Sequence, residues 1–158
     1  MKAVANALRR PVRILRANQK SWISAALAFA LLAPASVFAQ ENDTGLRVEL
    51  NAIDTLGENC RLTFVLQNKM ADDIDQLVAE TVLFSDEGGV VLLTLFDFAA
   101  VPAGRSRVRQ FQVPNTSCDR LGQVLMNGID TCTISGAASQ ACAQNLEVSS
   151  RVRIALGG

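Results

Sequence analysis

Four cysteines are the side chains of this 158-residue chain with the plainest chemistry, because pairs of thiols can be oxidised to disulfides. They are Cys60, Cys118, Cys132 and Cys142. No two of them form a Cys-x-x-Cys pair, which is the spacing of many redox-active thiols. They are also too far apart along the chain for a clustered zinc site. We therefore expect two structural disulfides and no bound metal.

The chain contains no histidine and no tyrosine. Histidine is the usual general base near neutral pH, so its absence excludes Ser-His-Asp and Cys-His catalysis. Carboxylates are left as candidates, and Asp97 is the one we expect to be desolvated, because it lies in an apolar segment. The composition favours a non-enzymatic protein with no catalytic residues and no cofactor. A hydrolase that uses carboxylates alone is the alternative.

Two further charged groups could bind ligands. Asp72, Asp73 and Asp75 lack the fixed spacing and glycine bend of a calcium loop, so we expect a solvated turn. Arg105, Arg107 and Arg109 alternate, which places them on one face of a regular strand. This stripe is either a solvent face or charged edge that resists aggregation, which we favour, or a docking stripe for an acidic partner.

Residues 90–98 are apolar on both faces of the predicted strand, although a sandwich strand needs only one apolar face. The first face holds Val90, Leu92, Phe96 and Phe98, and the second holds Val91, Leu93 and Leu95. The second face is either covered by a loop or by the segment around Leu121, which we favour, or it is a partner surface. It is the best candidate for a binding surface in the sequence.

The first 39 residues have the composition of a secretory signal peptide. A basic region without acids precedes an apolar run at residues 23–33, and small residues follow up to Ala39. The basic residues are Lys2, Arg9, Arg10, Arg13, Arg16 and Lys20. We expect cleavage between Ala39 and Gln40 and release into the periplasm or the medium.

Other interpretations of the leader fit less well. The apolar run is about half of the roughly 20 residues that span a membrane, and Pro34 ends it, so no stable membrane span is expected after cleavage. Arg9-Arg10 could belong to a twin-arginine signal, but its surroundings favour the general secretory route. The compact apolar core and the later cysteines argue against a mitochondrial leader.

Cleavage would change the charge of the protein. The leader holds six of the fifteen basic residues and none of the fifteen acidic ones, so the mature chain has a formal charge of −6. Such a charge works against nucleic acid or anionic lipid as the main partner.

Short segments of alternating or continuous apolar character predict about seven strands in residues 46–158, after a short linker at residues 40–45. The predicted strands are residues 46–52, 60–67, 77–84, 90–98, 107–113, 123–134 and 146–156. This pattern is typical of an all-β, immunoglobulin-like antiparallel sandwich, preceded by the signal-peptide helix. A small open barrel is the alternative.

The sandwich topology selects one of the three possible cysteine pairings. Cys60 starts the second strand and Cys118 lies between the fifth and sixth, at the same end of a Greek-key sandwich whose successive strands alternate in direction. Cys132 and Cys142 lie together at the opposite end. We therefore predict Cys60–Cys118 and Cys132–Cys142, because the other pairings would span the long axis of the domain.

Residues 68–111 resemble the FxLYD-type family of small exported immunoglobulin-like domains. The resemblance rests on Asn68, on Phe84-Ser85-Asp86-Glu87-Gly88, on Val101-Pro102-Ala103-Gly104 and on Phe111. The Tyr-Asp of that family is Ser85-Asp86 in this chain. The resemblance implies the sandwich fold and no catalytic residues. The chain as a whole is similar to small exported proteins of Gram-negative bacteria.

The sequence therefore favours an exported, non-enzymatic interaction or accessory protein that docks on an unidentified protein of the cell envelope. The arginine stripe and the strand at residues 90–98 are the candidate partner surfaces. Besides the carboxylate-only hydrolase, a structural subunit of a surface assembly is an alternative, and it would need an open or missing strand.

Overall fold

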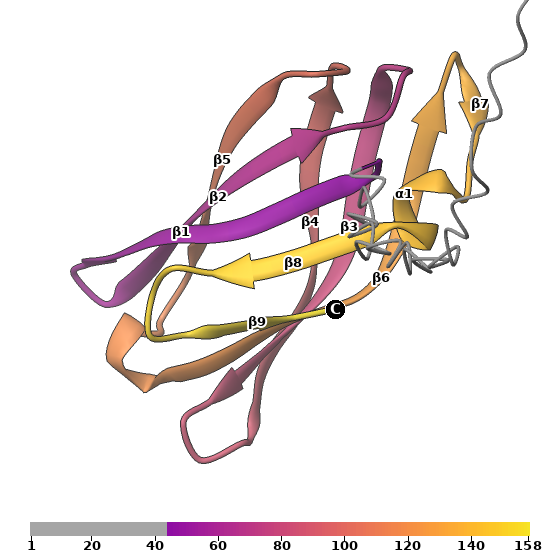
Figure 1. Cartoon of the computed structure of the whole chain (residues 1–158). Helices are drawn as coiled ribbons and strands as arrows, with labels where there is room; N and C mark the ends of the chain where they lie inside the picture. Colours follow the sequence, from indigo (N-terminus) through magenta and orange to yellow (C-terminus); the bar gives the residue numbers. More distant parts are fainter. Residues whose placement is uncertain (1–43) are drawn as a thin grey trace, which may run out of the picture. The chain divides into compact units, whose positions relative to one another are not determined.

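The computed structural model describes residues 44–158, and the predicted leader with its signal-peptide helix lies outside the described residues. This part of the chain is built almost entirely of strands (Figure 1). The strands are β1 (Leu46–Leu56), β2 (Asn59–Asn68), β3 (Ile74–Ser85), β4 (Val90–Val101), β5 (Ser106–Val113), β6 (Leu121–Ile134), β7 (Ala137–Ala138), β8 (Leu146–Ser150) and β9 (Ala155–Gly157). The helical segments are the 3-10 turn η1 (Cys118–Arg120) and the short helix α1 (Ala141–Gln144).

The strands form two sheets that pack as a sandwich (Figure 1). The first sheet has the order β5-β2-β1-β8, and the second has the order β4-β3-β6-β7, with β9 also paired to β6. Neighbouring strands are antiparallel, except that β8 runs parallel to β1 and β9 runs parallel to β6. The predicted all-β sandwich is therefore present, and the small open barrel is not formed.

The alternation of apolar and polar residues along a strand identifies the side that faces the core. In β2, the alternate residues Cys60, Leu62, Phe64 and Leu66 are all buried. In the turn after β3, Gly88 adopts a φ of 85°, which favours glycine over other residues. The predicted strands up to residue 134 are all present within one or a few residues of their expected ends.

The C-terminal strand differs from the prediction of one strand over residues 146–156. The chain bends after Ser150, whose Oγ donates a hydrogen bond to the carbonyl oxygen of Ile154 at 2.6 Å and accepts one from the Val152 amide at 3.3 Å. Ile154 is fully buried in the bend. As a result β8 belongs to the first sheet and β9 to the second, so the C-terminal segment passes from one layer to the other.

A cluster of four phenylalanines joins the two layers. Phe64 of the first sheet lies 5.6 Å from Phe98 and 5.9 Å from Phe96 of the second sheet, measured between ring centroids. Phe111 of β5 stacks on Phe96 at 4.1 Å. Edge-to-face and stacked arrangements of this kind add to the free energy gained by burying the rings. The cluster fixes β4 and β5 relative to β2.

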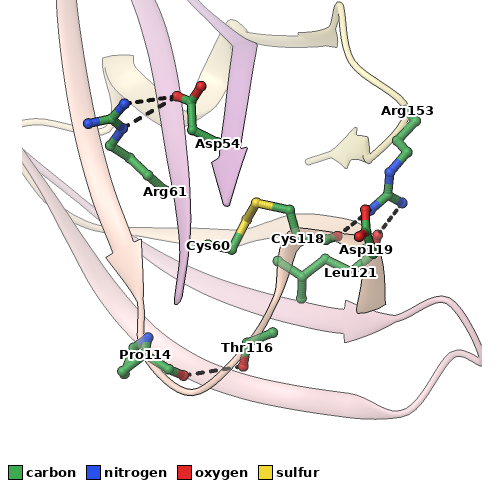
Figure 2. The surroundings of a disulfide bond; sticks show 9 residues. All are labelled: Asp54, Cys60, Arg61, Pro114, Thr116, Cys118, Asp119, Leu121 and Arg153. Atoms are coloured by element: carbon green, nitrogen blue, oxygen red, sulfur yellow. Dashed lines mark hydrogen bonds and ion pairs between the residues drawn. A yellow bond between two sulfur atoms is a disulfide. The ribbon is translucent and has the colours of Figure 1, made fainter. Parts of the chain in front are cut away.

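The two disulfides are the pairs predicted from the topology. Cys60 at the start of β2 is bonded to Cys118 in η1, with their Cα atoms 4.7 Å apart (Figure 2). Cys132 in β6 is bonded to Cys142 in α1, with a Cα separation of 6.1 Å. All four side chains are buried. The first bond ties the β5–β6 connection to the first sheet, and the second ties the C-terminal segment to β6.

The end of the sandwich at Cys118 has a second cross-link. The guanidinium of Arg153 donates hydrogen bonds to the carbonyl oxygens of Leu121, at 3.0 Å, and Cys118, and it lies 3.7 Å from Asp119 (Figure 2). The Arg153 side chain therefore connects the C-terminal segment to the disulfide turn.

Candidate interaction surface

The outward side of β4 carries apolar side chains in contact with solvent. Leu93 and Leu95 are 60% and 53% exposed. Leu93 is paired with Val82 of β3, and Val82 is paired with Leu125 of β6, so these side chains form a row across three strands. We call Leu93, Leu95, Val82 and Leu125 the β4 face. Val82, in the middle of the row, is only 7% exposed.

The expectation that a loop or the Leu121 segment covers this face is wrong for the described residues. Leu121 is fully buried inside the sandwich, so its side chain cannot cover the opposite side of the second sheet. Within residues 44–158 Leu93 and Leu95 remain exposed. An exposed apolar patch such as the β4 face commonly indicates an interaction surface.

Two of the three register shifts between β3 and β4 place an extra residue in β4. Leu83 pairs with Leu92 and Phe84 pairs with Val90, so Val91 is an extra residue. This shift explains why Val90, predicted to lie in the core, is 65% exposed, and Val91 is also exposed. The second shift lies at Phe98, and the neighbouring Ala99 has a φ of 54°. Bulges of this kind redirect side chains and disturb strand pairing.

Asp97 is not the desolvated carboxylate that the sequence predicted. Its side chain is exposed at the edge of the β4 face. It accepts hydrogen bonds from Gln76 Nε2 at 2.6 Å and from the Ala99 amide at 2.8 Å. Asp97 therefore stabilises the bulge in β4, and a solvated carboxylate in this position gives no support to acid–base catalysis.

The arginines do not form the predicted stripe. Arg105 lies in the turn before β5, whereas Arg107 and Arg109 occupy the same alternate positions as Phe111 and Val113, which point towards the second sheet. Arg109 donates hydrogen bonds to the carbonyl oxygens of Phe98 at 2.8 Å and Ala100 at 3.2 Å. It thus bridges the edges of the two sheets. In residues 44–158 none of the three arginines has an acidic side chain within ion-pair distance.

The acidic connection after β2 has a structural role. Asp73 accepts a hydrogen bond from the Ala103 amide at 2.7 Å, and Asp75 accepts one from the Gly136 amide at 2.8 Å. Asn68 is buried and donates to the carbonyl oxygens of Asp72 and Val101 at 2.8 and 2.9 Å. No group of acidic, cysteine or histidine residues within the described part of the chain could hold a metal ion.

A cavity of about 370 Å³ opens beside the start of β4. It is lined by Ser85, Val91, Pro114, Asn115, Thr116 and Arg120. Arg120 donates to the Asn115 carbonyl oxygen at 3.0 Å and contributes a positive charge to the lining. The cavity therefore lies between the start of β4 and the connection from β5 to β6.

The surroundings of Glu49 change its protonation equilibrium. Hydrogen bonds from Asn51, at 2.8 Å, and from Arg151 hold the pKa of Glu49 below its ordinary value of 4.5. A carboxylate with a lowered pKa stabilises the folded state above the unfolded-state pKa, and this contribution is lost as the pH falls through the folded-state pKa.

We therefore expect the free energy of unfolding to decrease as the pH is lowered below about 4.5, and Glu49→Gln to reduce that dependence by a small amount. Urea unfolding of both proteins between pH 3 and 7, at intervals of about one pH unit, measures the effect. Parallel pH profiles for the two proteins would show that Glu49 makes no such contribution.

No helix among the described residues is long and apolar enough to cross a membrane. No protein-family model and no curated protein matches the chain. Among solved structures, the chain is similar to that of IrmA from Escherichia coli, with 13% sequence identity and a TM-score of 0.48. The match covers 68% of this chain and 91% of that chain.

Proposed function

We propose that the protein is an exported, non-enzymatic interaction module that binds a protein of the cell envelope through the β4 face. The observation that carries the proposal is the exposure of Leu93 and Leu95 on β4, where Leu93 continues the cross-strand row of Val82 and Leu125. Apolar side chains exposed to water favour association with another apolar surface.

Export is supported by the disulfides and by the sequence of the leader. Buried disulfides form and persist in oxidising compartments such as the periplasm, and are rare in the cytosol. The leader has the order of basic, apolar and small residues that signals secretion. Purified protein produced from the full-length chain should therefore begin at Gln40 and should be found in the periplasm or medium.

The absence of enzymatic activity is also part of the proposal. Asp97 is solvated and holds the β4 bulge, while Asp73 and Asp75 accept hydrogen bonds from backbone amides. These contacts give each acid a structural role and leave the hydrolase alternative without a favoured carboxylate pair.

The test of the proposed function is cross-linking in intact cells followed by purification of the protein. We expect a defined envelope protein to be captured by the native chain and lost with Leu93→Glu combined with Leu95→Lys, because both changes remove apolar contact area. Val108→Lys is the matched control, since Val108 is exposed to a similar degree on β5. Equal capture by all three proteins, or capture of nothing by the native chain, would contradict the proposal.

A further inference from the structure

Part of the hydrogen-bonding edge of β4 is open. β4 is the outermost strand of the second sheet, so one of its sides has no neighbouring strand among the described residues. Arg109 occupies the carbonyl oxygens of Phe98 and Ala100, which closes the far end of this side. Arg109 does not bond to the backbone of residues 92–96, which lie between the two extra residues of β4. An uncovered apolar edge strand is a template for pairing with another strand.

We propose that a second copy of this protein pairs with β4 in antiparallel orientation, with the two-fold axis at Thr94. This inference goes beyond the proposed function, because it uses the edge of β4 and leaves the β4 face free for the envelope partner. In this register the open segment pairs with itself. The pairs are Leu92 with Phe96, Leu93 with Leu95, Thr94 with Thr94, Leu95 with Leu93 and Phe96 with Leu92.

The side chains in this register are compatible with each other. Leu93 of one copy lies opposite Leu95 of the other, so four leucines gather on the outward side of the joined sheet. The two Thr94 side chains face each other at the centre, which is a favourable pair in antiparallel sheets. Residues 92–96 contain no charge, and this register places no two like charges directly opposite each other. A segment that complements itself in this way favours a second copy over an unrelated strand.

Charges at the two ends of the pair support the same arrangement. The β3–β4 turn carries Asp86 and Glu87 and precedes β4, while Arg105 and Arg107 follow its other end. Antiparallel pairing brings the acidic turn of one copy beside the arginines of the other. These groups have no ion-pair partner within the described residues of a single copy. Complementary charges at the ends would select this orientation.

The assembly would be a closed dimer. A two-fold axis uses the same edge on both copies, so each open edge is consumed once and no fibre can grow from it. The dimer would also place the two β4 faces side by side on one continuous sheet. This arrangement enlarges the apolar surface that the proposed function assigns to the envelope partner.

The experiment is sedimentation equilibrium of protein produced from the full-length chain, over a dilution series, with two charge variants. In the first, Leu93→Lys and Leu95→Lys place like charges opposite each other. In the second, Leu93→Glu and Leu95→Lys place opposite charges there, and the new lysine lies beside Glu80 of β3. Both variants remove the same two exposed leucines, so their folds should be equally preserved.

We expect the native protein and the Glu/Lys variant to have twice the mass of a single chain, and the Lys/Lys variant to dissociate at least about tenfold more readily. A single-chain mass for the native protein at every concentration would overturn the proposal. So would equal dimerisation of the two variants, because only the proposed register sets position 93 opposite position 95. If the protein does not form the dimer, the expected capture of an envelope protein by the native chain is unchanged, so the two proposals can fail separately.

Reversing the acidic turn gives a second, independent measurement. Asp86→Lys with Glu87→Lys should weaken the dimer by about tenfold, and adding Arg105→Glu with Arg107→Glu should restore it. Weakening without restoration would show that these charges do not face each other and would contradict the orientation.

Discussion

Replacing Cys60 and Cys118 together by alanine should lower the free energy of unfolding by about 4 kcal/mol. The bond closes a loop with a sequence separation of 58, so its loss restores a large conformational entropy to the unfolded chain. It also releases η1 from β2 at the end of the sandwich shown in Figure 2. A small domain has a total stability of roughly 5–15 kcal/mol, so this loss is a large fraction of it.

The matched control is the double replacement of Cys132 and Cys142 by alanine. That bond closes a loop with a sequence separation of only 10, so we expect a smaller loss of about 3 kcal/mol. Urea denaturation of the native protein and both variants, purified under the same conditions, gives the comparison. A larger loss for the short loop than for the long one would contradict the assignment of stability to loop closure.

Phe64→Ala should destabilise the fold by about 3–5 kcal/mol, because it leaves a cavity where the two sheets meet. Phe64 is 1% exposed and contacts the rings of Phe96, Phe98 and Phe111. Those contacts come from β4 and β5, so the loss should also loosen the edge that presents the β4 face. Thermal and urea unfolding measure the first effect, and hydrogen exchange of the β4 amides measures the second.

Val108→Ala provides the surface control for that experiment. Val108 is 56% exposed on β5, so its truncation should change the free energy of unfolding by no more than about 0.5 kcal/mol. If Phe64→Ala cost no more than this control, the phenylalanine cluster would not be the junction of the two sheets.

The sequence is most informative where local pattern and tertiary structure agree. The alternation of Cys60, Leu62 and Phe64 identifies the inward side of β2, since the side chains of a strand alternate between its two faces. The pairing of the cysteines follows from the alternating direction of successive strands, because a disulfide cannot span the length of the sandwich.

The remaining features depend on contacts that local pattern does not contain. The break after Ser150 arises from hydrogen bonds to Val152 and Ile154, whereas the alternation of residues 146–156 continues through it. The inward position of Arg109 could have been inferred, because it has the same parity as Phe111 and Val113. The carbonyl oxygens of β4 that Arg109 binds could not be inferred in this way, since they belong to the other sheet.

The exposure of β4 was the hardest feature to predict. Apolar residues on both faces indicate either a covered strand or an interface, and the choice depends on whether another segment reaches the outer side. Leu121 was a reasonable candidate for a cover, but it packs in the core. The distinction between these outcomes therefore required the three-dimensional arrangement of β3, β4 and β6 (Figure 1).

The most direct test of the account is to place a photo-activated cross-linking side chain at Leu93 or Leu95 in the full-length chain and to irradiate intact cells. Val108, exposed on β5, is the control position. We expect adducts to the same envelope protein from Leu93 and Leu95 and none from Val108. Adducts from Val108 alone, or from none of the three positions, would contradict the claim that the β4 face is the surface through which this protein acts.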